Sequence, residues 1–114
     1  MDELFEKSLL YDFYGELLTE HQKSVYERFV FDDMSLAEVA DEEGISRQGV
    51  HDLVKRCDKI LQGYEEKLHL VEKFVSIKKK ATEIDKLTSE TDLKKQAEAL
   101  KAIKMLAGGI IEEL

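Results

Sequence analysis

The segment SLAEVADEEGISRQGVHDLV, residues 35–54, decides the fold. Ser35 and Ser46 can each cap the start of a helix, and Glu38 completes a capping box with Ser35. Between the two predicted helices, Gly44 suits the left-handed backbone that ends a helix and turns the chain. The small Ala40 lets the second helix approach the first closely. The spacing therefore predicts a helix-turn-helix, two helices that cross over a turn of three or four residues.

The second helix of this motif has an apolar side, and that side determines which residues face outward. The apolar residues that repeat at helical spacing are Val50, Leu53, Val54 and Cys57. The predicted DNA contacts are the residues of the opposite side: Ser46, Arg47, Gln48, His51, Asp52, Lys55, Arg56 and Lys59. Ser35, at the start of the first helix, is predicted as a further contact.

The chemistry of these side chains matches the major groove of a DNA duplex. Arg47 can bridge O6 and N7 of guanine, and Gln48 can pair with N6 and N7 of adenine. The Ser46 hydroxyl and the free N–H groups at the helix start suit a phosphate, and the later cations are expected to contact phosphates too. Four cations stand against Asp52 and Asp58 on this helix, so its charge is positive.

Two more helices are predicted before the motif, because apolar residues repeat at helical spacing and no period-two run is long enough for a strand. The first is expected over residues 2–18. Its wide apolar face repeats every four residues, at Phe5, Leu9, Phe13 and Leu17, and is flanked by Leu10 and Tyr14. The second begins after Thr19, which can form a capping box with Gln22. Its buried stripe is expected to contain Val25, Tyr26, Phe29 and Val30.

The chain after the motif is predicted to be a long helical extension. The apolar repeat continues into the high seventies, so one helix is expected from about Arg47, with Gly63 as the point where it kinks or where two helices meet. A last helix is expected to be capped by Thr88 and Ser89 and to end at Gly108 and Gly109. Its narrow seam consists of Leu93, Ala97, Leu100, Ile103 and Ala107. So thin a seam needs a partner surface, either the long helix or a second subunit.

The predicted fold is therefore all-α, with a trihelical helix-turn-helix core that is not a winged helix and a long C-terminal helical extension. Residues 1–62 are expected to form the N-terminal helix and the helix-turn-helix domain. Residues 63–114 are expected to form the extension and to dimerise. A set of four aromatic residues either fills the core or lines an interface: Tyr11, Tyr14, Tyr26 and Phe31.

Composition narrows the classes of function. The 114 residues include no proline and one cysteine, with no apolar run near 18 residues and an acidic start. An internal disulfide, a membrane span and a signal peptide are not expected, and a cytoplasmic location is. His21, His51 and His69 share no metal-ligand spacing with each other or with Cys57, and no phosphate-cradling glycine loop occurs. Neither a metal, a cofactor nor an enzymatic activity is expected.

The formal net charge of −8 is unevenly distributed along the chain. Residues 1–44 contain three cations and thirteen carboxylates, whereas residues 45–114 contain fourteen cations and twelve carboxylates. Since DNA affinity comes largely from lysine and arginine on phosphates, a DNA partner would have to bind the second region.

Sequence motifs in and around the helix-turn-helix resemble two groups of proteins. LTEHQ (residues 18–22), SLAEVA (35–40) and ISRQGV (45–50) resemble the promoter-reading C-terminal region of sigma factors, region four. YDFY (11–14), LLT (17–19), QK (22–23), DMSL (33–36), SRQ (46–48) and YEEKL (64–68) are similar to the YlxM family of Gram-positive bacteria. The resemblance covers about residues 8–75.

The resemblance to YlxM implies a small helical DNA-binding regulator. It also implies a link to the signal recognition particle, because genes of this family lie beside those for the GTPase of that particle. His51 and Asp52 depart from the sigma pattern, which usually has more cationic residues there. The sigma domains that bind core polymerase are not present in these residues, so a complete sigma factor is not implied.

Two hypotheses of function follow. The first is a dimeric regulator that inserts one recognition helix per subunit into double-stranded DNA and is joined through its C-terminal helices, with half-sites about 34 Å apart. The second is an adaptor that contacts a protein or ribonucleoprotein, such as the signal recognition particle or RNA polymerase, through the same helical surface. The Ser46-Arg47-Gln48 start favours the first, whereas the acidity and Asp52 favour the second.

Overall fold

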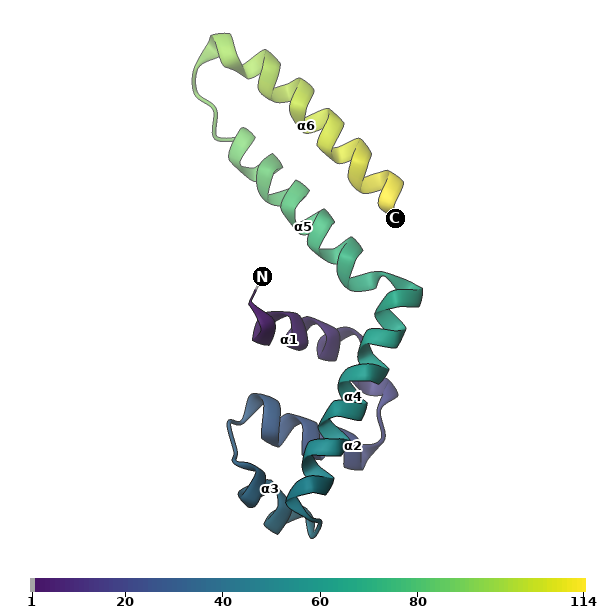
Figure 1. The fold of residues 1–114 in the computed structure, drawn as a ribbon. Coiled ribbons are helices and arrows are strands. Elements are labelled where there is room, and N and C mark those ends of the chain that lie inside the picture. Colours follow the sequence, from purple (N-terminus) through teal and green to yellow (C-terminus); the bar gives the residue numbers. More distant parts are fainter. Residues whose placement is uncertain (1) are drawn as a thin grey trace. The chain divides into compact units, whose positions relative to one another are not determined.

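The computed structural model describes residues 2–114, and within that range it contains helices and no strand (Figure 1). The elements are α1 (Glu3–Tyr14), the 3-10 turn η1 (Gly15–Leu17), α2 (Glu20–Tyr26), the π-helix η2 (Glu27–Phe31), α3 (Leu36–Glu43), α4 (Arg47–Leu68), α5 (Leu70–Leu87) and α6 (Leu93–Glu113). The prediction of an all-α fold is confirmed. No helix in this range is long and apolar enough to cross a membrane.

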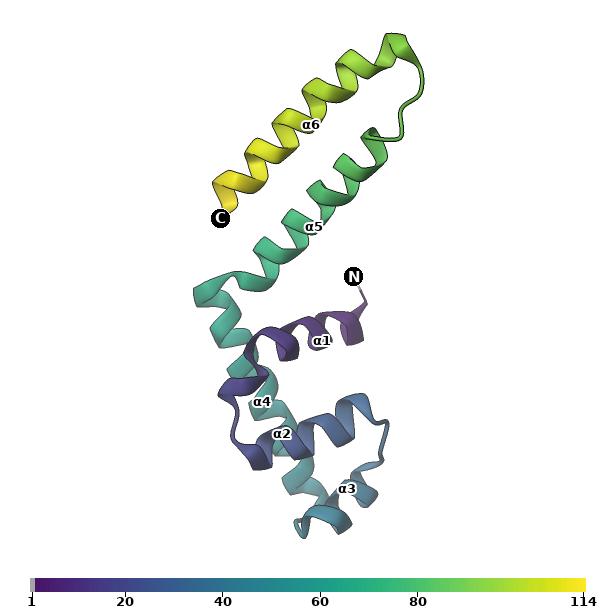
Figure 2. The ribbon, with the colours of Figure 1, turned by 180° about the vertical axis from the view of Figure 1, so that it is seen from behind.

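The chain divides into two compact units, the first ending at His69 and the second comprising Leu70–Leu114. The boundary lies seven residues after the expected one at residues 62 and 63. In the first unit, α1, α2 and α3 each pack on α4, as Figure 2 shows from behind. Helix α4 is therefore the central helix of this unit.

The N-terminal helix packs through one flank of its predicted apolar face. Leu9, Leu10 and Tyr14 are buried, whereas Phe5 and Leu17 are 43% and 56% exposed. The prediction is therefore confirmed at Leu9 and at the flanking Leu10 and Tyr14, and it is wrong for Phe5, Phe13 and Leu17. The buried side faces α4, where the Tyr14 hydroxyl donates to Glu65 across 2.6 Å.

The second helix begins as predicted and ends in a π-helix. Thr19 and Gln22 form the expected capping box, with the Gln22 N–H 3.1 Å from the Thr19 hydroxyl. Val25 and Tyr26 are fully buried, but Phe29 and Val30 are only partly so. The π-helix explains the difference, because its wider turn moves the later residues off the helical stripe.

The helix-turn-helix forms as the sequence predicts. Ser35 and Glu38 make the capping box of α3, and Val39 and Ala40 are buried against α4. Gly44 ends α3 in the left-handed conformation, with φ of 69°. Ser46 then caps α4 by accepting the Gly49 N–H across 2.9 Å.

A pair of glycine substitutions tests these backbone assignments. Gly44→Ala is expected to reduce the free energy of unfolding by about 1 kcal/mol, because a left-handed φ strains any residue with a Cβ. A Cβ at Gly44 meets no atom within 4 Å, so the loss of stability would come from backbone strain alone.

Gly63→Ala is the control, because Gly63 lies within α4 with equal space around its Cβ position. That variant is expected to be more stable than wild type by about 0.5–1 kcal/mol in urea denaturation. Destabilisation by Gly63→Ala would contradict the continuous helix.

The long helix ends at His69 and passes through Gly63 without a break. Both predicted alternatives, one helix into the high seventies and two helices that meet at Gly63, are therefore wrong. His69 has a φ of 56°, and its N–H donates to the Glu65 carbonyl across 2.9 Å. Histidine is among the few residues other than glycine that are enriched in this conformation, so the apolar pattern of the sequence does not reveal the break.

The second unit is an antiparallel hairpin of α5 and α6 (Figures 1 and 2). Asp92 caps α6, and the helix continues through Gly108 and Gly109, so the predicted cap at Thr88 and Ser89 and the predicted end are wrong. The predicted seam is also wrong in part, because Leu93 and Leu100 are exposed and Ala97 is too. The side that packs on α5 contains Ala99, Ala102, Ile103, Leu106 and Ile110. The face is shifted because α6 has apolar residues on two sides, and α5 covers the side that contains Ala99.

Candidate nucleic-acid interface

Every residue predicted to contact DNA is exposed. These residues are Ser35, Ser46, Arg47, Gln48, His51, Asp52, Lys55, Arg56 and Lys59. On α4 they lie opposite the buried side chains of Val50, Val54, Cys57 and Leu61. Exposure makes the predicted contacts available to a ligand, and their binding role remains a prediction.

The exposed residues of α4 form a ridge along the helix, which we call the α4 ridge: Arg47, His51, Lys55 and Lys59, with Gln48, Asp52 and Arg56 beside them. Its members recur every four residues, so they share one side of the helix. Twelve residues of helix correspond to a length of about 18 Å. Ser35 is not part of this ridge, because it lies at the far end of α3 from the turn and its hydroxyl caps the Glu38 N–H.

The start of α4 is held in shape by Gly49 as well as by its cap. A Cβ at Gly49 would lie 3.0 Å from the Ser46 hydroxyl oxygen, so a larger residue would push the cap aside. The Ser46 hydroxyl is already bound to the Gly49 N–H, which leaves the N–H groups of Arg47 and Gln48 for a phosphate. Gly49 is not among the predicted site residues. Its place three residues after the capping Ser46 does, however, indicate that its N–H is the one that the serine hydroxyl accepts.

Within the ridge, the side chain of Gln48 is hydrogen-bonded to Asp52. The Gln48 amide donates to Asp52 Oδ1 across 3.0 Å, and His51 Nδ1 lies 3.7 Å from the same oxygen. Gln48 and Asp52 are four positions apart on the helix, a spacing that favours a hydrogen bond between side chains, so this contact could have been predicted from the sequence. Asp52 therefore places a carboxylate in the ridge and competes with a base for the Gln48 amide.

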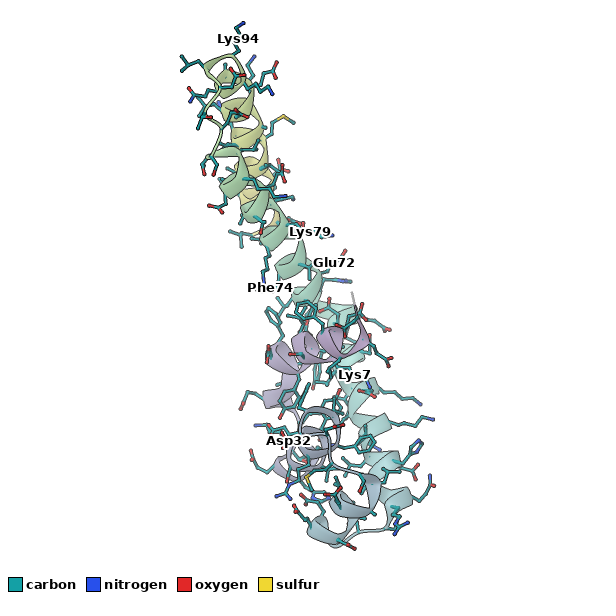
Figure 3. The ribbon with its side chains drawn as sticks, turned by 90° about the vertical axis from the view of Figure 1, so that its left-hand side faces the viewer. Lys7, Asp32, Glu72, Phe74, Lys79 and Lys94 are labelled. Atoms are coloured by element: carbon teal, nitrogen blue, oxygen red, sulfur yellow. The ribbon has the colours of Figure 1, made fainter. Side chains whose placement is uncertain are left out.

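Asp58, the other carboxylate near the ridge, is turned toward the core. It accepts a 2.7 Å hydrogen bond from the Tyr26 hydroxyl and lies 3.7 Å from Lys7 Nζ of α1, a residue labelled in Figure 3. Burial, followed by this hydrogen bond, raises the pKa of Tyr26 far above its usual range, so the hydroxyl remains a donor. Asp52 is thus the one exposed carboxylate between Arg47 and Lys59.

Aromatic contacts fix α4 against the other helices of its unit. The Tyr26 ring stacks on Tyr11 at 5.6 Å and meets Phe31 edge-on at 5.8 Å, and Tyr14 stacks on Tyr64 of α4 at 5.9 Å. Tyr14 and Tyr26 are buried, and Tyr11 and Phe31 are half-buried. These contacts favour the first of the two predicted roles, that of filling the core, and the contact between Tyr14 and Tyr64 joins α1 to α4.

Cys57 belongs to the same packed interior. It is fully buried, and burial raises the pKa of its thiol to about 11. The thiol therefore stays protonated near neutral pH, as expected of a packing residue rather than a nucleophile. No cluster of three histidine, cysteine or carboxylate side chains that could hold a metal ion occurs in residues 2–114.

The cations of the first three helices are all paired with carboxylates. Lys23 Nζ lies 3.0 Å from Glu16 and 3.5 Å from Glu20, and Arg28 pairs with Glu42 and Glu43. Lys7 is shared between Glu3 and Asp58. The side of this unit formed by α1, α2 and α3 is therefore negative, and the α4 ridge is where a phosphate backbone would be attracted.

Comparison with known proteins agrees with this geometry. Residues 1–103 match the family UPF0122, described as "Putative helix-turn-helix protein, YlxM / p13 like". This description names no enzymatic activity. The chain is 40% identical over 116 residues to the UPF0122 protein of Acetivibrio thermocellus, which covers 98% of this chain and 99% of the relative. It is 41% identical over 104 residues to that of Clostridium kluyveri, covering 91% and 94% respectively. The chain is 52% identical over 73 residues to the UPF0122 protein of Clostridium botulinum, and this match covers 64% of this chain and 67% of the relative. The chain belongs to the UPF0122 family of YlxM/p13-like helix-turn-helix proteins.

Proposed function

We propose that this protein is a sequence-specific regulator that binds double-stranded DNA by placing the start of α4 in the major groove. The observation that carries the proposal is the α4 ridge, whose four cations, Arg47, Lys55, Arg56 and Lys59, form no ion pair with a carboxylate of the described residues. In α1, α2 and η2, by contrast, the cations Lys7, Lys23 and Arg28 are each paired with a carboxylate.

The ridge offers both kinds of contact that a DNA reader needs. Arg47 and Gln48 stand in the first turn of α4, where a recognition helix contacts base edges. Lys55, Arg56 and Lys59 lie one to three turns farther along, where they would contact phosphates. The base contacts would select a sequence, and the phosphate contacts would fix the orientation of the helix.

The proposal includes a homodimer. Three or four phosphate contacts per subunit give a salt slope of about −3 to −4, which is too small for tight binding by one subunit of an acidic protein. Two subunits joined through their C-terminal helices would read two half-sites about 34 Å apart along the duplex. A chromosomal target would place the protein in the cytoplasm.

Selection from a library of random duplexes tests this function directly. We expect the full-length protein to enrich one sequence with two related halves, and its affinity to fall steeply as salt is raised. Capture of chromosomal fragments with the tagged protein should recover the same sequence in cells. A selection that converges on no sequence would contradict the proposal.

A second candidate function is that of an adaptor that binds a protein or ribonucleoprotein. The observation in its favour is the negative side of the first unit, together with the carboxylate of Asp52 within the α4 ridge. The signal recognition particle, to which the YlxM resemblance points, and RNA polymerase are the two candidate partners. Purification of the tagged protein with bound protein or RNA, and without DNA, would favour this function.

The effect of Asp52 on DNA affinity can be tested by a single substitution. Asp52→Asn is expected to raise the affinity for DNA about threefold to tenfold at low salt, since it removes a charge beside the phosphates while keeping an oxygen for Gln48. Asp12→Asn on α1 removes the same charge from an exposed site outside the ridge and serves as the control. Fluorescence anisotropy with a labelled duplex measures both. A loss of affinity in Asp52→Asn would instead show that Asp52 accepts a hydrogen bond from cytosine.

A further inference from the structure

Besides the side that packs on α5, α6 carries a second apolar stripe, which we call the outer stripe. Its members follow one another at alternating intervals of four and three residues: Leu93, Ala97, Leu100, Lys104, Ala107, Ile111 and Leu114. Leu93 is 81% exposed, Leu100 66% and Ile111 72%. Lys104 interrupts the stripe at its centre, and the exposed leucine and isoleucine side chains on either side of it form an apolar surface of a kind that monomeric proteins rarely present.

The spacing of the outer stripe is that of a seam between helices. Alternating intervals of four and three residues give the heptad repeat through which one helix interdigitates with another, and α6 is 21 residues long, or three heptads. α5 already covers a different side of α6, where Ala99 is 8% exposed. The helix that covers the outer stripe must therefore come from outside the α5–α6 hairpin.

We propose that the outer stripe binds the outer stripe of a second copy of this chain in antiparallel orientation, so that two α5–α6 hairpins form a four-helix bundle. The inference rests on the proposed function, because it identifies the surface that joins the two DNA-reading subunits. It assigns one partner to the stripe and one direction to the pairing.

The charges at the two ends of α6 favour the antiparallel direction. The helix begins with Lys94 and Lys95 and ends with Glu112 and Glu113, which is the reverse of what its own dipole favours. Lys94 projects from the loop end of the hairpin (Figure 3), and Glu113 is already paired with Lys80 across 3.0 Å. An antiparallel copy would bring Lys94 near Glu112 of the partner subunit, whereas a parallel copy would bring like charges together.

The apolar surface of the hairpin is wider than the outer stripe. A groove lined by Leu87, Gln96, Leu100 and Ile103 adjoins the stripe, so the apolar surface extends from α6 toward α5. One helix about 10 Å wide and about 30 Å long presents on the order of 300 Å². A stable interface needs about 600–1,000 Å² per partner, so both helices of each hairpin have to contribute, as they do in a four-helix bundle.

Sedimentation of the full-length protein in the absence of DNA tests the dimer. We expect wild type at twice the monomer mass of 13.1 kDa. Leu100→Glu with Ile111→Glu should raise the dissociation constant of the dimer at least about a hundredfold. Met105→Glu is the matched control, because Met105 is 79% exposed on the charged side of the same helix and should leave the dimer intact. Circular dichroism verifies that each variant keeps its helices. A wild-type monomer at every attainable concentration would overturn the proposal, and the stripe would then belong to a different partner protein.

Charge reversal tests the direction of the pairing. Lys94→Glu and Glu112→Lys should each weaken the dimer, and the two substitutions in one chain should restore it. If the double variant dimerises no more tightly than the weaker single variant, the antiparallel arrangement is wrong.

The proposed function and the proposed dimer can fail separately. A stable dimer that selects no DNA sequence contradicts the proposed function alone, and a monomer that selects a DNA sequence contradicts the dimer alone.

Discussion

Arg47→Ala combined with Gln48→Ala is expected to abolish sequence-specific DNA binding while leaving the fold intact. Both side chains are exposed, and alanine is the residue that favours a helix most, so stability should change little. Each good bidentate contact to a base contributes about 1–3 kcal/mol of discrimination, so the double variant should lose about 2–6 kcal/mol. That loss corresponds to a fall of about 30-fold or more in the ratio of specific to non-specific affinity.

The appropriate measurement compares the selected duplex with a scrambled duplex over a range of salt concentrations. The matched control is Lys55→Ala with Lys59→Ala, which should weaken binding to both duplexes equally and reduce the salt slope by about 2. The two double variants thus separate base contacts from phosphate contacts. An unchanged ratio of affinities in the Arg47 and Gln48 variant would contradict the assignment of the recognition helix.

Tyr26→Ala is expected to cost about 3–5 kcal/mol of folding free energy, enough to unfold much of the first unit. Tyr26 is fully buried, stacks on Tyr11, meets Phe31 edge-on, and donates to Asp58 of α4. Removing a buried aromatic side chain leaves a cavity as well as lost apolar burial. Urea denaturation followed by circular dichroism measures the effect.

Tyr26→Phe isolates the hydrogen bond from the packing. This variant keeps the ring but leaves Asp58 without its hydroxyl partner, and we expect a loss of about 1.5–3 kcal/mol, as for a hydrogen bond to a charged group. Tyr11→Phe is the control, because the Tyr11 hydroxyl pairs with Glu27 in an exposed setting where such a bond contributes little. Equal losses in the two phenylalanine variants would show that the bond between Tyr26 and Asp58 does not anchor α4.

Features that depend on neighbouring residues could be predicted from the sequence. The caps at Thr19, Ser35 and Ser46 and the left-handed turn at Gly44 involve residues at most three positions apart. The outward side of α4 followed from its apolar side, because the buried stripe of a helix fixes the opposite one. The exposure of the candidate site residues could therefore be predicted, whereas their role in binding stays a prediction.

Features that depend on the partner of a helix could not be predicted. On α1 the apolar face is wider than the side that α4 covers, and the sequence does not show that its flank with Tyr14 is buried while Phe5 and Leu17 stay exposed. The break at His69 interrupts an apolar repeat that continues on both sides, so periodicity does not detect it. On α6 two apolar sides compete, and the sequence does not show which of them α5 covers.

Titration of the isotope-labelled full-length protein with its selected duplex, followed by amide chemical shifts in NMR spectra, tests the central claim most directly. If α4 enters the major groove, the largest shifts should fall between Ser46 and Lys59, with small changes on the negative side formed by α1, α2 and α3. Large shifts on that negative side, with the start of α4 unaffected, would contradict the account.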